Sequence, residues 1–222
     1  GGQGGGVLAG WIETVARAAG WSAQTTSVAG VAQRTGATIY YIEMAAPTAG
    51  QPVFALAPSA GDVDIVLAAE LMEAGRAIQR GFVTPDRTLL IAATHRALAI
   101  SEKMVPGDGI ADGEQVLAVA PLAARQVLLA DFEALAGQAG SVISASLLGG
   151  LAGSGGLPFQ RAEYEAAIRA GGKGTLASPA AFAAGFEAVR QADKPKAPGP
   201  TVSPAAVTGP PRLLADWERL VR

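Results

Sequence analysis

The distribution of apolar residues along the chain predicts an alternation of strands and helices. Four short runs are apolar or β-branched and of strand length: residues 38–44, 64–69, 88–94 and 126–130. Between the second and third runs, Leu71 to Phe82 has the spacing of a helix. Short continuous apolar runs are typical of strands buried on both faces, and the β-α-β order argues for a parallel sheet. The pattern therefore predicts an α/β fold: an open, mainly parallel, Rossmann-like sheet covered by helices.

The other helices are predicted from apolar spacing in Ala-rich segments. They comprise residues 7–20, 112–125, 132–138, 141–151, 160–169 and 178–191. Residues 134–160 carry no charged side chain and exceed the ~20 residues that span a bilayer. Because their large apolar residues form only an approximate stripe among Gly, Ser and Ala, we favour a buried, closely packed helix over a membrane helix. The N-terminus shows no secretory signal, so a cytoplasmic location is expected.

A change in proline content divides the chain. Residues 1–192 are predicted to form one domain that begins with a glycine-rich strand-to-helix loop. Residues 193–211 contain six prolines and are predicted to be a linker, and residues 212–222 are predicted to start a further helical segment. In α/β proteins a strand normally precedes a glycine loop of this kind, so we interpret the sequence as a fragment that begins one strand late.

The opening glycine loop, Gly-Gly-Gln-Gly-Gly-Gly, runs directly into the first helix. Because N–H groups at a helix start bind phosphate well, Gly2, Gln3, Gly4 and Gly5 are candidate cofactor-binding residues. The dinucleotide fingerprint is incomplete, since Val7 stands where the third glycine belongs, and no Walker lysine follows. Two alternatives stay open: a nucleotide- or flavin-binding module, and a tight turn that needs only close packing.

The composition limits the chemistry of the chain. It has no Cys and one His, which excludes disulfides and thiolate-held zinc or iron–sulfur clusters, and no metal site or catalytic residue is predicted. The formal charge of −2, with no basic block, makes nucleic acid an unlikely partner. Any redox centre is expected in another chain.

A second polar loop follows the first helix. Residues 26–38 contain Gly-Val-Ala-Gln-Arg-Thr-Gly and lead into the strand at Thr38. The pairing of GGQGGGVLA with this loop resembles the gamma domain of thiamine-dependent 2-oxoacid:ferredoxin oxidoreductases, and most of all the beta subunits of indolepyruvate ferredoxin oxidoreductases. The resemblance covers roughly residues 1–190 and includes the segments 62–70 and 157–159. Ala29 and Ser144 depart from it, since relatives often have His or Pro at the first position and Asn at the second.

The resemblance implies a subunit of an enzyme complex that converts an arylpyruvate and coenzyme A to aryl-acetyl-CoA, carbon dioxide and reduced ferredoxin. It places thiamine diphosphate, magnesium and 4Fe-4S clusters in a partner alpha subunit, with ferredoxin as the acceptor and coenzyme A at the interface. The chain alone is expected to bind no cofactor and to be inactive. The loop 26–38 and the helix 141–151 are expected docking surfaces. A purely structural assembly subunit is the alternative.

Several side chains are candidates for a role at such an interface. Gln33, Arg34 and Gly36 complete the candidate cofactor-binding set; Arg34 can clamp a phosphate or carboxylate, or form a salt bridge that docks the partner. His95 follows a strand, where open sheets place ligand groups, but an ordinary loop residue is favoured. Glu70 is expected to cap the following helix.

Overall fold

The structure is a computed structural model that describes residues 4–29, 38–96, 113–171 and 177–192. The N-terminal half contains α1 (Gly5–Ala18), β1 (Ser22–Ala29), β2 (Thr38–Ala45), the short η1 (Pro47–Ala49), β3 (Ile65–Ala68), α2 (Leu71–Gln79) and β4 (Leu89–Ala93). The C-terminal half contains α4 (Gly113–Ala123), β5 (Gln126–Ala130), α5 (Phe132–Gln138), α6 (Ile143–Ser154), α7 (Arg161–Ala170) and α8 (Ala177–Ala192). The predicted linker and final helix, residues 193–222, lie outside the described residues.

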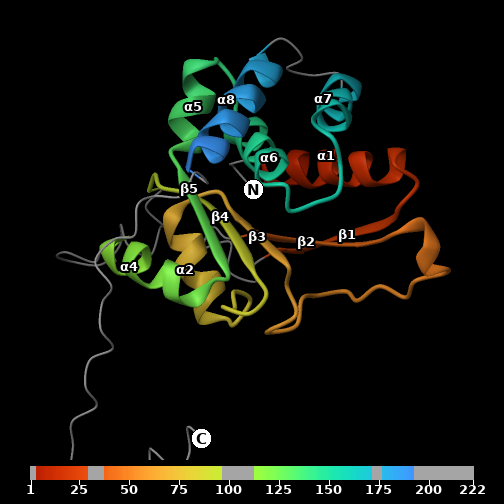
Figure 1. Ribbon diagram of the computed structural model, residues 1–222, viewed down its shortest axis with the longest axis horizontal. Coiled ribbons are helices and arrows are strands. Elements are labelled where there is room, and N and C mark those ends of the chain that lie inside the picture. The colour runs from red at the N-terminus through yellow and green to blue at the C-terminus, as the bar shows by residue number, and fades with distance from the viewer. Residues whose placement is uncertain (1–3, 30–37, 97–112, 172–176, 193–222) are drawn as a thin grey trace, which may run out of the picture.

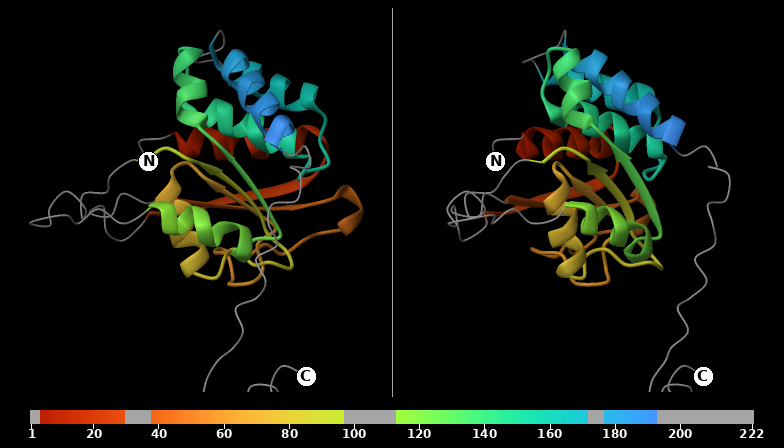
Figure 2. Two further views of the ribbon diagram at one scale, coloured as in Figure 1. Left: turned by 60° about the vertical axis from the view of Figure 1, so that its left-hand side comes forward. Right: turned by 90° about the vertical axis from the view of Figure 1, so that its left-hand side faces the viewer.

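The strands lie between two layers of helices, which confirms the predicted α/β fold. Helices α1 and α5 to α8 cover one face, and α2 and α4 cover the other (Figures 1 and 2). Strands β3, β4 and β5 form a parallel sheet in sequence order. Its central strand β4 is buried along its whole length because its side chains alternate between the two layers. Leu89 and Ile91 belong to the cluster under α6, and Leu90 belongs to the cluster under α2.

A two-stranded antiparallel sheet, β1–β2, corrects the prediction for residues 26–29. The sequence predicted a polar loop there, whereas the structure continues β1 through Ala29 and pairs it with Thr38 at the start of β2. The Ser and Thr residues of β1 hid the strand, because they are equally common in turns. The apolar, β-branched β2 supplies a pairing partner, and Thr and Val favour extended backbone.

Helices α6 and α8 pack with their backbones in contact. Every residue of α6 from Ile143 to Leu151 is buried, so this part of the helix is core and is not the docking surface that the sequence predicted.

In the part of the chain that the structure describes, no single helix has the length and hydropathy to cross a membrane. Helices α5 and α6 taken together have the length and composition of a membrane span, but the chain bends by 117° at the break between them.

A row of aromatic rings runs through the helical layer that contains α7 and α8. It connects Trp21, Phe159, Tyr164, Phe182 and Phe186, with successive ring centroids 5.4 to 6.3 Å apart. Five of the twelve aromatic residues of the chain therefore stabilise this one layer.

Tyr164 in this row predicts a change in the pH dependence of stability. Its hydroxyl is buried and has no hydrogen-bond partner among the described residues, and burial raises its pKa well above the usual value. The neutral phenol is therefore favoured in the folded protein, and stability falls as the pH rises above ~10, where the unfolded chain ionises. We expect Tyr164→Phe to be as stable as the parent or up to ~1 kcal/mol more stable at pH 7, because it removes an unsatisfied group.

Urea unfolding at pH 7 and at pH 10.5 checks this expectation. The difference in stability between the two pH values is expected to be smaller for Tyr164→Phe than for the parent. A variant that is less stable at pH 7, with an unchanged pH dependence, would contradict the assignment of an unpartnered hydroxyl.

Candidate functional site

Glycines occupy the N-cap and the first turn of α1, where the backbone conformation or close packing leaves no room for a side chain. Gly4 is the N-cap residue, and its φ of +72° lies in the left-handed region, where any side chain is strained. Its carbonyl accepts hydrogen bonds from the N–H groups of Val7 and Leu8. The N–H groups of Gly5 and Gly6, in the first turn, have no acceptor within the helix. These amides point out of the helix start, which gives this end a partial positive charge.

A serine hydroxyl lies directly beside this helix start. Ser144, in the first turn of α6, is fully buried, and its Oγ has no hydrogen-bond partner among the described residues. A Cβ added to Gly4 would lie 3.1 Å from that oxygen. By contrast, the nearby Ser146 hydroxyl donates to the carbonyl of Phe132 at 2.6 Å. A buried hydroxyl without a partner costs free energy, so a ligand that hydrogen-bonds to Ser144 would recover that cost. Ser144 is therefore a candidate binding group beside the start of α1.

The ring of Tyr40, from β2, covers the other side of the helix start. A Cβ on Gly5 would lie 2.7 Å from Cε2 of this ring, and a Cβ on Gly6 would lie 3.3 Å from its hydroxyl. Glycines at these two positions therefore let the ring pack against the helix backbone. The sequence placed Tyr40 in a strand but gave no local signal that its ring would meet the glycine loop 34 residues earlier in the sequence.

We predict opposite effects for two alanine substitutions in α1. Gly5→Ala is expected to lower the free energy of unfolding by about 1 kcal/mol or more, because the methyl group displaces the Tyr40 ring. Gly10→Ala, in the same helix, faces open space and is expected to raise it by ~0.5 to 1 kcal/mol. Thermal or urea unfolding of both variants tests the pair; equal stability of the two would contradict the packing against Tyr40.

The structure describes only two of the residues that the sequence predicts to bind a cofactor. Gly4 and Gly5 lie at the start of α1 beside Ser144 and Tyr40, whereas Gly2, Gln3, Gln33, Arg34 and Gly36 lie outside the described residues. Their role stays a prediction. The structure adds Ser144 and Tyr40 to the same region; the sequence had singled out Ser144 only as a departure from the family pattern.

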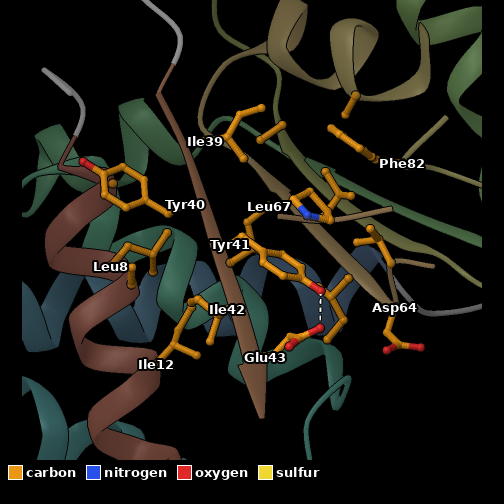
Figure 3. Close-up of a pocket in the computed structure, with 18 of the residues that line it drawn as sticks. Leu8, Ile12, Ile39, Tyr40, Tyr41, Ile42, Glu43, Asp64, Leu67 and Phe82 are labelled. Atoms are coloured by element: carbon orange, nitrogen blue, oxygen red, sulfur yellow. Dashed lines mark hydrogen bonds between the residues drawn. The ribbon is translucent and has the colours of Figure 1, made fainter. Parts of the chain in front are cut away.

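A cavity lies beside this helix start, between β2 and β3 (Figure 3). It has a volume of about 620 Å³. Leu8 and Ile12 of α1 line one side, Ile39 and Ile42 of β2 stand between the two helical layers, and Leu67 of β3 faces them from across the cavity. Apolar side chains therefore form much of its wall, and the charged residues Glu73, Arg76 and Arg80, from α2 and its C-terminal end, line it as well.

Charged side chains gather at one rim of this cavity, near the start of β3. Arg87 forms ion pairs with Asp62 and with Asp64, the latter at 2.8 Å. Glu43 accepts a hydrogen bond from the Tyr41 hydroxyl at 2.5 Å and another from the N–H of Ala55 at 2.6 Å. Burial, and secondly the bond to Glu43, raise the pKa of Tyr41 to about 12. These groups satisfy one another and tie the segment around Ala55 to β2.

The other candidates have structural roles. Glu70 precedes α2, but its carboxylate makes no capping hydrogen bond; it is buried, 3.8 Å from the guanidinium of Arg76, so the predicted side-chain cap is wrong. The carbonyl of His95 accepts a hydrogen bond from the N–H of Leu71, which fixes the start of α2. Asp131 is exposed and accepts a hydrogen bond from the N–H of Ala134, which caps the start of α5. Among the described residues, no group of three or more His, Cys, Asp or Glu side chains is arranged to hold a metal ion.

The fold and the helix start define an α/β protein with a glycine-rich turn beside its sheet. Residues 1–189 match the family described as pyruvate ferredoxin/flavodoxin oxidoreductase, and the chain belongs to this family. A comparison with curated protein sequences found no match. A solved structure, that of pyruvate oxidoreductase subunit PORC from Thermotoga maritima, has a similar fold: the TM-score is 0.55 at 19% identity, over 84% of this chain and 90% of that chain.

Proposed function

We propose that this chain is the gamma-domain part of a thiamine-dependent 2-oxoacid:ferredoxin oxidoreductase whose substrate is indolepyruvate or a related arylpyruvate. The family match over residues 1–189 carries the proposal. The loop motifs around Gly4 and Arg34, which are most similar to indolepyruvate enzymes, support the choice of substrate.

In this proposal, the chemistry is divided between subunits. Decarboxylation of a 2-oxoacid requires an electron sink, which thiamine diphosphate supplies when it is bound to the partner alpha subunit together with magnesium and 4Fe-4S clusters. A chain without Cys and with one His provides no ligand set for such clusters. Its own contribution is to complete the complex, and the isolated chain is expected to be inactive.

The start of α1 is the part of the chain that we assign to coenzyme A. First-turn amides and the Ser144 hydroxyl suit a phosphate oxygen, because both donate hydrogen bonds and the helix dipole favours negative charge. A Cβ on Gly4 would lie 3.1 Å from the Ser144 Oγ, so a side chain at that position would contact this hydroxyl. Gly2, Gln3, Gln33, Arg34 and Gly36 are proposed to extend the same surface.

The activity test uses the complex. The chain is co-expressed with its thiamine- and cluster-bearing partner, and reduction of ferredoxin or of a viologen dye is followed with indolepyruvate, phenylpyruvate or pyruvate, with and without coenzyme A. We expect reduction only when both subunits, an arylpyruvate and coenzyme A are present. A preference for pyruvate would overturn the proposed substrate, and full activity without this chain would overturn the proposed role.

Substitutions in the same complex test the coenzyme A assignment. Ser144→Ala is expected to raise the KM for coenzyme A about tenfold, because one hydrogen bond to a charged group is lost, and to leave the KM for the 2-oxoacid unchanged. Ser146→Ala is the matched control: it loses the bond to Phe132 and some stability, but no affinity for coenzyme A.

Arg34→Ala distinguishes ligand binding from docking. A raised KM for coenzyme A would support a phosphate clamp, whereas a lower yield of complex with an unchanged KM would assign Arg34 to the subunit interface. If neither Ser144→Ala nor Arg34→Ala changes the KM for coenzyme A, this chain does not hold that cofactor.

A further inference from the structure

Segment 52–58, which lies between η1 and β3, presents apolar side chains to solvent. Its sequence is Pro-Val-Phe-Ala-Leu-Ala-Pro and contains no charged residue. Val53 is 99% exposed and Leu56 is 77% exposed. A single exposed apolar residue needs no explanation, but two of them within four positions of one ordered segment indicate an interaction surface. We call this pair the Val53–Leu56 surface.

Polar side chains of β1 and β2 hold the backbone of this segment. The Gln24 amide donates a hydrogen bond to the carbonyl of Ala55 at 3.0 Å, and the Thr26 hydroxyl donates to the carbonyl of Leu56 at 2.9 Å. From the neighbouring strand, the Glu43 carboxylate accepts a hydrogen bond from the N–H of Ala55 at 2.6 Å. The segment therefore runs back alongside the two strands, as Figure 1 shows.

The two faces of the β1–β2 sheet explain why the apolar side chains of this segment stay outside. Ala23 and Ile42 pack in the core cluster that includes α1. Because side chains alternate along a strand, Gln24 and Glu43, which lie opposite each other in the register, belong to the other face. That face offers hydrogen bonds, so it satisfies the backbone of segment 52–58 but does not bury its apolar side chains.

The segment is also fixed at its ends. A proline stands at each end and restricts the backbone there. Just beyond it, the N–H of Gly61 donates a hydrogen bond to the carbonyl of Gly81 at 2.8 Å, and Asp62 pairs with Arg87. A surface whose backbone is already held loses little conformational entropy on binding, so apolar contacts made there contribute more fully to affinity.

Carboxylates border the Val53–Leu56 surface. Glu43 bonds to the segment itself, Asp62 and Asp64 follow it in the chain, and Arg87 pairs with both aspartates. Three carboxylates and one guanidinium give this group a net charge of −2. A second copy docked through the same surface would bring like charges together, and an anionic membrane would repel them. The charge therefore favours a different protein, one that presents Lys or Arg side chains around an apolar recess.

We propose that the Val53–Leu56 surface docks the thiamine- and cluster-bearing partner subunit, in an apolar recess with a basic rim. The choice of this partner rests on the proposed function. The surface itself rests on the exposure of the two side chains, the anchored backbone and the bordering carboxylates. It is distinct from the loop 26–38 and the helix 141–151, which the sequence predicted as docking surfaces.

The affinity between this chain and the purified partner subunit tests the proposal. The double variant Val53→Ser/Leu56→Ser is expected to raise the Kd about tenfold or more, because two apolar side chains lose their buried contacts. The matched control Val119→Ser/Leu122→Ser changes two exposed apolar residues of α4 and is expected to leave the Kd within about twofold. Both variants should melt close to the parent, since substitutions at exposed positions change stability little.

The salt dependence of association tests the basic rim separately. Added salt screens the attraction between the carboxylates and a basic partner, so we expect the association rate of the parent to fall several-fold between low and high salt. A rate that is constant or that rises with salt would overturn the proposed chemistry of the partner.

The remaining outcomes separate this inference from the proposed function. Equal affinities of the parent and of Val53→Ser/Leu56→Ser overturn the inference alone, whereas a parent chain that binds no thiamine- and cluster-bearing subunit overturns both. An effect of the double variant on self-association only, with unchanged affinity for the partner subunit, would assign the surface to a second copy and overturn the inference.

Hydrogen exchange gives a direct readout of the same surface. Binding of the partner subunit is expected to slow amide exchange in segment 52–58 and to leave α4 unchanged. If instead deletion of residues 193–222 from the isolated chain speeds exchange in segment 52–58, that part of the same chain covers the surface and the inference is overturned.

Discussion

Gly149→Ala and Gly185→Ala are each expected to destabilise the protein by about 3 kcal/mol or more, since large effects of this kind arise where a new methyl group meets rigid backbone. A Cβ on Gly149 would overlap the carbonyl of Phe182 in α8 and lie 2.9 Å from the N atom of Phe186. A Cβ on Gly185 would overlap the carbonyl of Ser146 in α6. The two glycines thus allow reciprocal contact between the helix backbones, and neither helix can yield without disturbing the buried core.

Gly137→Ala is the matched control for these variants. Gly137 lies in α5, and a Cβ there would meet nothing within 4 Å, so the substitution should be neutral or stabilise the helix by up to ~1 kcal/mol. Urea unfolding of the three variants measures the difference. If Gly149→Ala or Gly185→Ala unfolds at the same urea concentration as Gly137→Ala, the close packing of α6 on α8 is wrong.

Phe182→Ala is expected to lower the free energy of unfolding by ~3 to 5 kcal/mol, the usual cost of removing a buried aromatic ring. Phe182 is fully buried, lies between Tyr164 and Phe186 in the aromatic row, and its ring centroid lies 6.3 Å from each of theirs. The ring therefore connects α7 to α8 and cannot be replaced by a small side chain without leaving a cavity.

Phe182→Leu separates the volume of this side chain from its aromatic character. A leucine retains most of the apolar contact, so a loss of roughly 1 to 2 kcal/mol is expected. Calorimetry or urea unfolding gives both values. A Phe182→Ala variant that loses less stability than Phe182→Leu would contradict the assignment of Phe182 to the core.

The strands at the centre of the fold could be predicted because each is a short apolar run that is recognisable without knowledge of its neighbours. Residues 89–93 and 126–130 are short apolar runs, and the structure places β4 and β5 there. Strand β1 was not predictable in the same way: Gln24 to Ser27 are polar, and their extended conformation depends on pairing with β2, which is distant in sequence. Helix α2 ends earlier than predicted, at Gln79, because Gly81 takes a positive φ.

The candidate site was predictable only as a helix start rich in glycine. The left-handed conformation of Gly4 is a local property that a glycine at this turn allows. The partners of this loop, Tyr40 and Ser144, come from β2 and α6, and only the packed fold brings them together. The side-chain cap expected from Glu70 failed for a similar reason, since its pairing with Arg76 in a buried setting depends on tertiary packing.

The proposed role of this chain as a subunit without its own cofactor can be tested by the native mass and cofactor content of the complex that co-purifies with the tagged full-length protein. We expect a heteromeric assembly with a larger partner, in which thiamine diphosphate and iron are present and are retained by the partner when this chain is removed. A chain that purifies alone and monodisperse, binds no thiamine- and cluster-bearing subunit at micromolar concentration, or itself carries a bound flavin, would contradict its assignment as a cofactor-free subunit of such an enzyme.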